Sequence, residues 1–156
     1  MASDDFHGCK LALMDDSARL LVYLRDDKPE IRCPNMWDLP GGGRENNESA
    51  EICVLRELKE EFDLTMTQER LLYKRRYHHP DRGYSYFFAG TISKTEIGAI
   101  AFGDEGQHWT MMALDDYFAH PQAIESHKIR LRDCLDALRS GGLTIKPNPH
   151  PSSGES

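Results

Sequence analysis

The run from Gly42 to Leu64, GGRENNESAEICVLRELKEEFDL, constrains this chain more than any other stretch. It begins within an expected glycine-rich turn, Gly41-Gly42-Gly43, and later places three carboxylates, Glu57, Glu60 and Glu61, within five residues. A helix turns about 100° per residue, so residues three and four apart share one face. Like charges at that spacing destabilise a helix by tenths of a kcal/mol, so we expect a compensating partner outside the helix. A divalent cation would compensate directly, because Mg²⁺ takes carboxylate oxygens and retains waters and substrate phosphates.

The predicted helix spans about residues 48 to 62 and has two different faces. Ala50 and Cys53 lie on the side of the carboxylates, and their small side chains are expected to leave room above that face. The opposite side carries an apolar stripe predicted to pack against the rest of the protein. This stripe consists of Ile52, Leu55, Leu58 and Phe62, with Val54 at its margin.

Composition narrows the class of protein. The 156 residues suit one domain with a real core. The net charge of −7 argues against binding to a nucleic-acid backbone, although a bound metal could still attract a small phosphorylated substrate. The chain starts with acidic and polar residues, which is not typical of a signal peptide, and no apolar run reaches the roughly 18 residues needed to span a membrane.

The cysteines indicate a reducing environment. They are widely spread and form no CxxC pair, so we expect neither a zinc site nor a disulfide framework. Reduced thiols in a cytoplasmic protein are the simplest interpretation. The four are Cys9, Cys33, Cys53 and Cys134.

The remaining pattern predicts an α+β fold with a mixed, mostly antiparallel sheet, because strands and helices alternate irregularly. Apolar runs around the turn signal Asp15-Asp16-Ser17 predict a β-hairpin, and loops are expected at 26–35 and 93–106. A second amphipathic helix is expected over 123–139, with a stripe of Ile124, Ile129, Leu131, Leu135 and Leu138. Strands are expected at 10–14, 19–25, 37–39, 71–78, 84–92 and 107–114, with a helical turn at 115–119.

The run Gly42 to Leu64 resembles the signature of the Nudix hydrolases, G-x5-E-x7-R-E-U-x-E-E-x-G-U, in which U is apolar. Every constrained position matches except the last glycine, which is Asp63 here, and the upstream WDLPGGG resembles the family's entry to this motif. The resemblance implies a Nudix-type α/β/α sandwich over residues 8–140. Residues 1–7 are expected to be a flexible N-terminus and residues 141–156 a disordered tail.

Two departures from the family pattern concern glycine positions. Asp63 replaces the glycine just past the helix, where a left-handed backbone is usual. Asn35 stands where many relatives have glycine, two positions before the tryptophan. Asp and Asn visit the left-handed region more readily than most residues, at roughly 1 kcal/mol, so we expect both to preserve the backbone geometry.

By position, the resemblance implies that Glu57, Glu60 and Glu61 bind Mg²⁺ or Mn²⁺. Glu60 and Glu61 would also be catalytic, while Arg56 would hold a glutamate in place and Glu48 would support the same network. Glu105, in the loop before the strand at 107–114, is a candidate general base or additional metal ligand by analogy alone.

Substrate contacts are expected from Arg25, Gly41, Gly42 and Trp37. For Arg25 the alternative is a surface ion pair with Asp26 or Glu30, and for Trp37 it is a place in the core or at its rim.

Other polar residues are expected to be structural. The basic run 74–76 on a strand is interpreted as a solvated sheet edge rather than a substrate contact. His78, His79 and His108 lack zinc-ligand spacing. His127 could face a base pocket, but capping or packing is favoured.

The function implied is hydrolysis of a nucleoside diphosphate linked to another group. The favoured substrate is a nucleoside triphosphate, oxidised or otherwise non-standard, cleaved to the monophosphate and pyrophosphate. The alternatives are a nucleotide-sugar or ADP-ribose pyrophosphatase, and a non-catalytic nucleotide-sensing module, which usually loses the glutamates kept here. We expect no nucleic-acid or membrane partner, and a monomer or homodimer.

Overall fold

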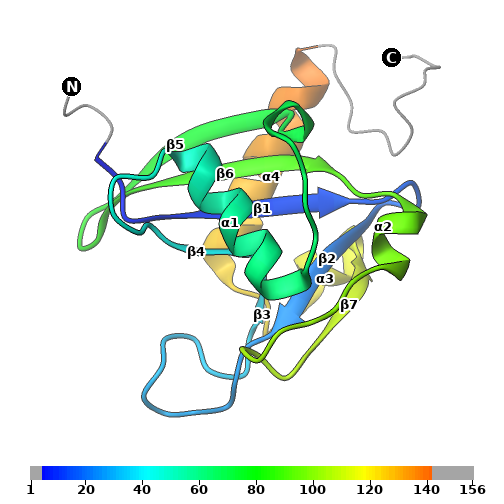
Figure 1. The fold of residues 1–156 in the computed structure, drawn as a ribbon, viewed down its shortest axis with the longest axis horizontal. Helices are drawn as coiled ribbons and strands as arrows, with labels where there is room; N and C mark the ends of the chain where they lie inside the picture. Colours follow the sequence, from blue (N-terminus) through cyan, green and yellow to red (C-terminus); the bar gives the residue numbers. More distant parts are fainter. Residues whose placement is uncertain (1–4, 142–156) are drawn as a thin grey trace.

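A mixed seven-stranded sheet forms the centre of the protein in the computed structural model, which describes residues 5–141 (Figure 1). The strand order is β3-β2-β1-β6-β5, with β4 paired to β1 and β7 paired to β2. Only the β1–β6 pair is parallel among the pairs of the described strands. The strands are β1 Gly8–Met14, β2 Arg19–Leu24, β3 Trp37–Asp38, β4 Gly41–Gly43, β5 Tyr73–His79, β6 Gly83–Thr91 and β7 His108–Ala113.

Helices cover both faces of this sheet, with α1 on one side and α4 on the other (Figure 1). Alternate side chains of β1 point to opposite faces. Leu11 and Leu13 therefore join a core cluster under α1, whereas Ala12 and Met14 join a second cluster under α3 and α4. This arrangement confirms the expected α/β/α sandwich. The helices are α1 Ala50–Phe62, α2 Lys94–Gly98, α3 Leu114–Ala119 and α4 Glu125–Ser140, with a 3₁₀ turn at Gln68–Arg70.

Local capping sets the ends of α1. The Ser49 hydroxyl accepts the backbone N–H of Ile52 at 3.1 Å, which satisfies one free donor of the first turn. Asp63 ends the helix with φ 57° and ψ 36°, and its N–H donates to the Lys59 carbonyl at 2.9 Å. Asn35 also has a positive φ of 59°. Both departures from glycine therefore keep the expected left-handed backbone.

The predicted packing face of α1 is partly wrong. Ile52 is 51% exposed, whereas Ala50 and Cys53 are fully buried. The reason is strand β4, whose glycines have no side chains and let the helix approach on its small-residue side. The Cys53 thiol donates to the Gly42 carbonyl at 3.8 Å, so the space expected above these small side chains is filled by backbone.

The same kind of error affects α4. Ile129 is 52% exposed although it was expected in the apolar stripe, while Leu131 and Leu138 are buried as predicted. The buried face instead includes the polar residues His127 and Lys128. Periodicity located the helix, but the sheet and loops around it determine which side is covered.

Two smaller expectations also change, and a third is confirmed. The loop expected at 93–106 contains α2, which starts with a capping box formed by Ser93 and Glu96. The triple glycine is a strand rather than a turn. The basic run 74–76 lies on β5, an edge strand, as predicted.

The predicted chain ends lie partly outside residues 5–141. Residues 1–4 and 142–156 belong to the expected flexible N-terminus and tail, and they are outside the described range. Within that range Phe6 is only 5% exposed, and the His7 N–H donates to the Tyr84 carbonyl at 2.8 Å. These two residues are therefore packed rather than loose. No helix between residues 5 and 141 has the length and apolar character to cross a membrane.

Candidate active site

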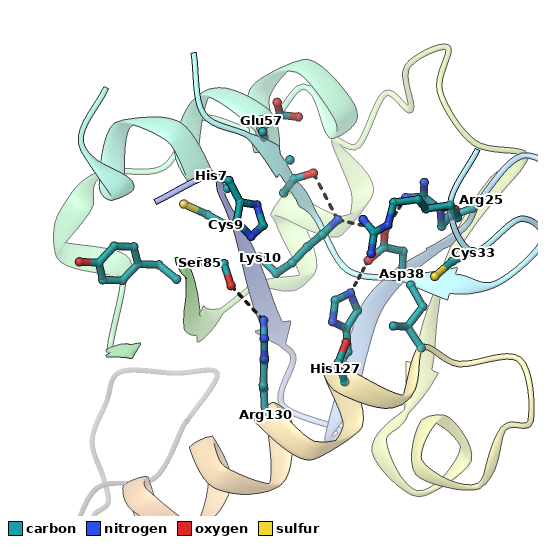
Figure 2. Close-up of a pocket in the computed structure, with 18 of the residues that line it drawn as sticks. His7, Cys9, Lys10, Arg25, Cys33, Asp38, Glu57, Ser85, His127 and Arg130 are labelled. Atoms are coloured by element: carbon teal, nitrogen blue, oxygen red, sulfur yellow. Dashed lines mark hydrogen bonds and ion pairs between the residues drawn. The ribbon is translucent and has the colours of Figure 1, made fainter. Parts of the chain in front are cut away.

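A cavity of about 580 Å³ opens between the glycine strand, the first residues of β1 and α4 (Figure 2). Its lining brings together six residues expected at the site from sequence. Three other predicted site residues, Arg56, Glu60 and Trp37, do not line it. The six that do are Arg25, Gly41, Gly42, Glu57, Glu61 and Glu105.

Glu57 and Glu61 lie on α1, on the face that meets the glycine strand. Glu61 is buried and accepts the N–H of Gly41 at 2.9 Å. Burial raises the pKa of Glu61 to about 8, and burial also raises the pKa of Glu57. Both carboxylates have been taken out of water with few hydrogen-bond donors in return. A cation in the cavity would lower the pKa of both groups and so favour their charged forms.

Arg56 joins α1 to the glycine strand from outside the cavity. Its guanidinium donates to Glu48 at 3.0 Å, to Glu57 at 3.1 Å and to the Gly43 carbonyl at 2.9 Å. It also contacts Glu60 at 3.2 Å, so this half-exposed carboxylate lies on the Arg56 side and away from the cavity. Arg56 thus occupies a place suited to orienting Glu57.

The donor set facing the cavity fits a hard divalent cation. Within residues 5–141, no three side chains of His, Cys, Asp or Glu are grouped so that they could hold a metal ion by themselves. Glu57 and Glu61 nevertheless supply carboxylate oxygens beside backbone carbonyls of the glycine strand. Mg²⁺ binds through one or two carboxylates and completes its shell with waters and substrate phosphates, which matches this arrangement.

Sequence reasoning missed a buried ionic cluster around Asp38. This side chain is 1% exposed and accepts from Lys10 Nζ at 2.9 Å, Arg25 Nη1 at 2.9 Å and the Tyr23 hydroxyl at 3.2 Å. Burial alone would raise the pKa of Asp38, but the positive charge of Lys10 and a hydrogen bond with His127 hold it well below its usual range. The expected surface partners of Arg25 are therefore wrong, because its ion pair is with Asp38.

His127 completes this cluster from the first turn of α4. Its Nε2 lies 2.7 Å from Asp38 Oδ1, and its Nδ1 is buried without a hydrogen-bond partner among the described residues. Burial lowers the pKa of His127 despite the opposing effect of Asp38, which favours the neutral ring. A neutral ring that donates from Nε2 leaves Nδ1 as an acceptor. His127 therefore both packs, as favoured from the sequence, and lines the cavity.

Trp37 lies apart from the cavity. Its ring contacts His108 and His120 edge-on, with centroids 5.5 and 6.2 Å away, and it packs against the core cluster under α3 and α4. This position matches the alternative of a residue at the rim of the core. The spacing of WDLPGGG could have directed attention to Asp38 instead, because alternate residues of a strand face opposite sides.

The family of the chain is now clear. Residues 10–134 match the model of the NUDIX domain, so the chain belongs to the Nudix family. An 8-oxo-dGTP diphosphatase of Proteus vulgaris is 42% identical over 77 residues, which are 49% of this chain and 69% of that relative. A putative 8-oxo-dGTP diphosphatase of Bacillus subtilis (strain 168) is 24% identical over 141 residues, 89% of this chain and 86% of the relative. The chain is a hydrolase acting on pyrophosphate bonds.

Solved structures share the fold at low identity. An Ap4A hydrolase of C. elegans superposes with a TM-score of 0.67 at 18% identity, covering 86% of this chain and 98% of that one. A bifunctional NMN adenylyltransferase/ADP ribose pyrophosphatase of Francisella tularensis, complexed with AMP and a Mn ion, gives a TM-score of 0.66 at 19% identity. This chain covers 42% of the length of the Francisella protein, and 86% of this chain is matched.

Asp38 provides a prediction about stability. Asp38→Asn leaves Lys10 and Arg25 without their carboxylate, so the free energy of unfolding should fall by about 3–5 kcal/mol at pH 7 in urea titrations. Because the pKa of Asp38 is depressed in the fold, its contribution exists above the unfolded value near 4 and is lost as the pH falls further. The gap between variant and wild type should therefore narrow below about pH 4. The exposed ion pair between Asp136 and Arg139 offers a control. A loss of stability as large for Asp136→Asn would contradict the importance assigned to Asp38.

The glycine strand provides a second prediction. A Cβ on Gly42 would lie 2.5–2.7 Å from the carboxylate of Glu57, the movable end of a side chain. Gly42→Ala should therefore fold, displace that carboxylate and lower turnover roughly 10²-fold, because misplacement by 1 Å is enough for such a loss. The matched control is Gly43→Ala, whose Cβ would meet only the His7 carbonyl at 3.9 Å. Equal turnover of the two variants, measured with thermal unfolding as a check of folding, would refute this explanation.

Proposed function

We propose that the chain is a Mg²⁺-dependent pyrophosphohydrolase that cleaves an oxidised or otherwise modified nucleoside triphosphate to the monophosphate and pyrophosphate. The observation that carries this proposal is the pair of desolvated carboxylates, Glu57 and Glu61, on the wall of a nucleotide-sized cavity beside the glycine strand. Mn²⁺ could replace Mg²⁺ at the same donors. The free thiols of the described residues agree with the cytoplasmic location that we also propose.

Each residue of the candidate site has a proposed task in this reaction. The bound metal would neutralise phosphate charge and position the attacking water. Glu57 and Glu61 would hold the metal, and Arg56 would keep Glu57 in place. Arg25 lines the cavity and carries further N–H donors besides those bound to Asp38 and the Arg32 carbonyl, so it can contact a phosphate.

Two tasks involve residues around the metal ligands. Glu60 would tune the metal site through Arg56, since it lies on that side of the helix. Glu105 lies in the exposed loop before β7 and lines the cavity, so we propose that it takes the proton from the attacking water. The backbone of Gly41 and Gly42 lines the cavity, so we propose that it contacts the pyrophosphate.

His127 supports a modified purine as the base. Oxidation at carbon 8 places a hydrogen on the neighbouring ring nitrogen, which is an acceptor in an ordinary purine. The unpartnered Nδ1 of His127 is an acceptor when Nε2 donates to Asp38, and because this atom is buried the base would reach it only after neighbouring side chains shift. A site with an unsatisfied acceptor favours a ligand that brings the matching donor. The two relatives named as 8-oxo-dGTP diphosphatases agree with this preference.

The metal proposal predicts the outcome of a nucleotide panel. With Mg²⁺, the full chain should release pyrophosphate from one or more triphosphates, and excess EDTA should stop the release. Glu61→Gln should lower turnover by orders of magnitude, because a metal ligand loses its charge. Glu69→Gln, which changes an exposed glutamate outside the cavity lining, should leave turnover intact. Turnover of ADP-ribose or a nucleotide sugar alone would favour the alternative substrates, and unchanged turnover of Glu61→Gln would remove it from the metal site.

The base proposal predicts a change in selectivity. His127→Phe keeps a ring but removes both nitrogens, so the ratio of kcat/KM for the 8-oxo-purine triphosphate over the ordinary one should fall about tenfold, the value of one lost hydrogen bond. The ratio cancels any loss of folded enzyme. An unchanged ratio would exclude His127 from base recognition.

A further inference from the structure

Three arginines from separate parts of the chain line the cavity that the glutamates also line. Arg32 comes from the loop between β2 and β3, Arg82 from the turn between β5 and β6, and Arg130 from α4. Figure 2 shows Glu57 and Arg130 on opposite sides of the cavity, with His7 and Ser85 between them. We call Arg32, Arg82 and Arg130 the arginine cluster.

These side chains lie within electrostatic reach of one another. Burial lowers the pKa of His7 first, and repulsion from Arg82, Arg130 and Arg32 lowers it further. Burial also lowers the pKa of Arg82, with Arg32 adding to the effect. Together with their shared place in the cavity lining, this mutual repulsion indicates that the positive charges lie near one another. The cavity therefore has a cationic end as well as an acidic one.

The arginine cluster has no carboxylate partner among residues 5–141. None of its members takes part in an ion pair there, and Arg130 donates only to the Ser85 hydroxyl at 3.1 Å while its guanidinium lies over the Tyr77 ring. The contrast is with Lys10 and Arg25 in the same cavity, both of which are paired with Asp38. A chain with net charge −7 has carboxylates to spare, so three unpaired arginines here are notable.

A bound anion would provide the missing charge. Guanidinium groups match the geometry of phosphate oxygens and bind them with two parallel hydrogen bonds. The glutamate end repels anions unless a metal is present, so the two ends suit two different parts of one ligand.

We propose that the arginine cluster is a second phosphate-binding subsite, which holds a phosphoryl group of the substrate other than the two joined by the scissile bond. The identity of the ligand as a substrate rests on the proposed function, whereas anion binding by the cluster does not. That phosphoryl group can come from the end of a polyphosphate chain or from a phosphate ester on the nucleoside sugar. Both sources present the same phosphoryl group to the arginines, and the second experiment below distinguishes them.

The first test is binding of inorganic phosphate to the full chain in EDTA, where the metal site cannot contribute. Titration at constant ionic strength, followed by NMR, should shift the signals of His7 and Ser85. In the double variant Arg32→Gln/Arg82→Gln binding should weaken by about tenfold or more, because charge-assisted hydrogen bonds are lost. Arg139→Gln, which removes an exposed arginine outside the cavity, should bind like wild type. Absent binding, or equal binding by wild type and the double variant, would overturn the proposal.

The second test identifies the source of the phosphoryl group. KM is compared for a nucleoside diphosphate, the triphosphate and a triphosphate carrying an additional sugar phosphate. If KM of the double variant rises about tenfold for both triphosphates but not for the diphosphate, the subsite binds the end of the polyphosphate chain. If KM rises only for the triphosphate with the additional sugar phosphate, the subsite binds that phosphate ester. A rise of the same size for all three, the diphosphate included, would overturn the subsite. Phosphate binding in EDTA without any turnover would contradict the proposed function alone.

Discussion

The close approach of the glycine strand to its neighbours is the constraint on which the site depends. Strand β4 pairs with the first residues of β1, and a Cβ on Gly41 would lie 2.1 Å from the Cys9 carbonyl. Gly41 also has a φ of 138°, which side chains rarely allow. Because the strand is bare, α1 can rest on it through Ala50 and Cys53. This contact places Glu57 and Glu61 at the cavity wall.

Electrostatics then divides the cavity into three parts. Two desolvated glutamates form one end, and in another part Lys10 and Arg25 share the single negative charge of Asp38. The arginine cluster forms the other end without a counter-charge among the described residues. Burial makes each of these charges expensive unless it is matched, so the pattern specifies the charges of a ligand. A metal-bound polyphosphate has that distribution.

Much of the fold could be predicted because it rests on local signals. The carboxylate spacing located α1, the turn at Asp15 located the first hairpin, and the tolerance of Asp63 and Asn35 for a left-handed backbone was foreseeable. The errors concern contacts between distant segments. Ile52 looked like core because periodicity alone cannot show that β4 lies on the other side of the helix. Trp37 was expected to contact substrate because its position along the strand did not show which way its side chain points.

The sequence by itself determined the family, the helix with its glutamates and the glycines beside them, because these features are set by spacing along one short segment. Only the tertiary structure decided that Asp38 meets Lys10, Arg25 and His127, residues up to 89 positions apart. It also decided that three arginines from two loops and a helix face one cavity. Such groupings depend on how the sheet brings distant strands together, and no local pattern of residues records that.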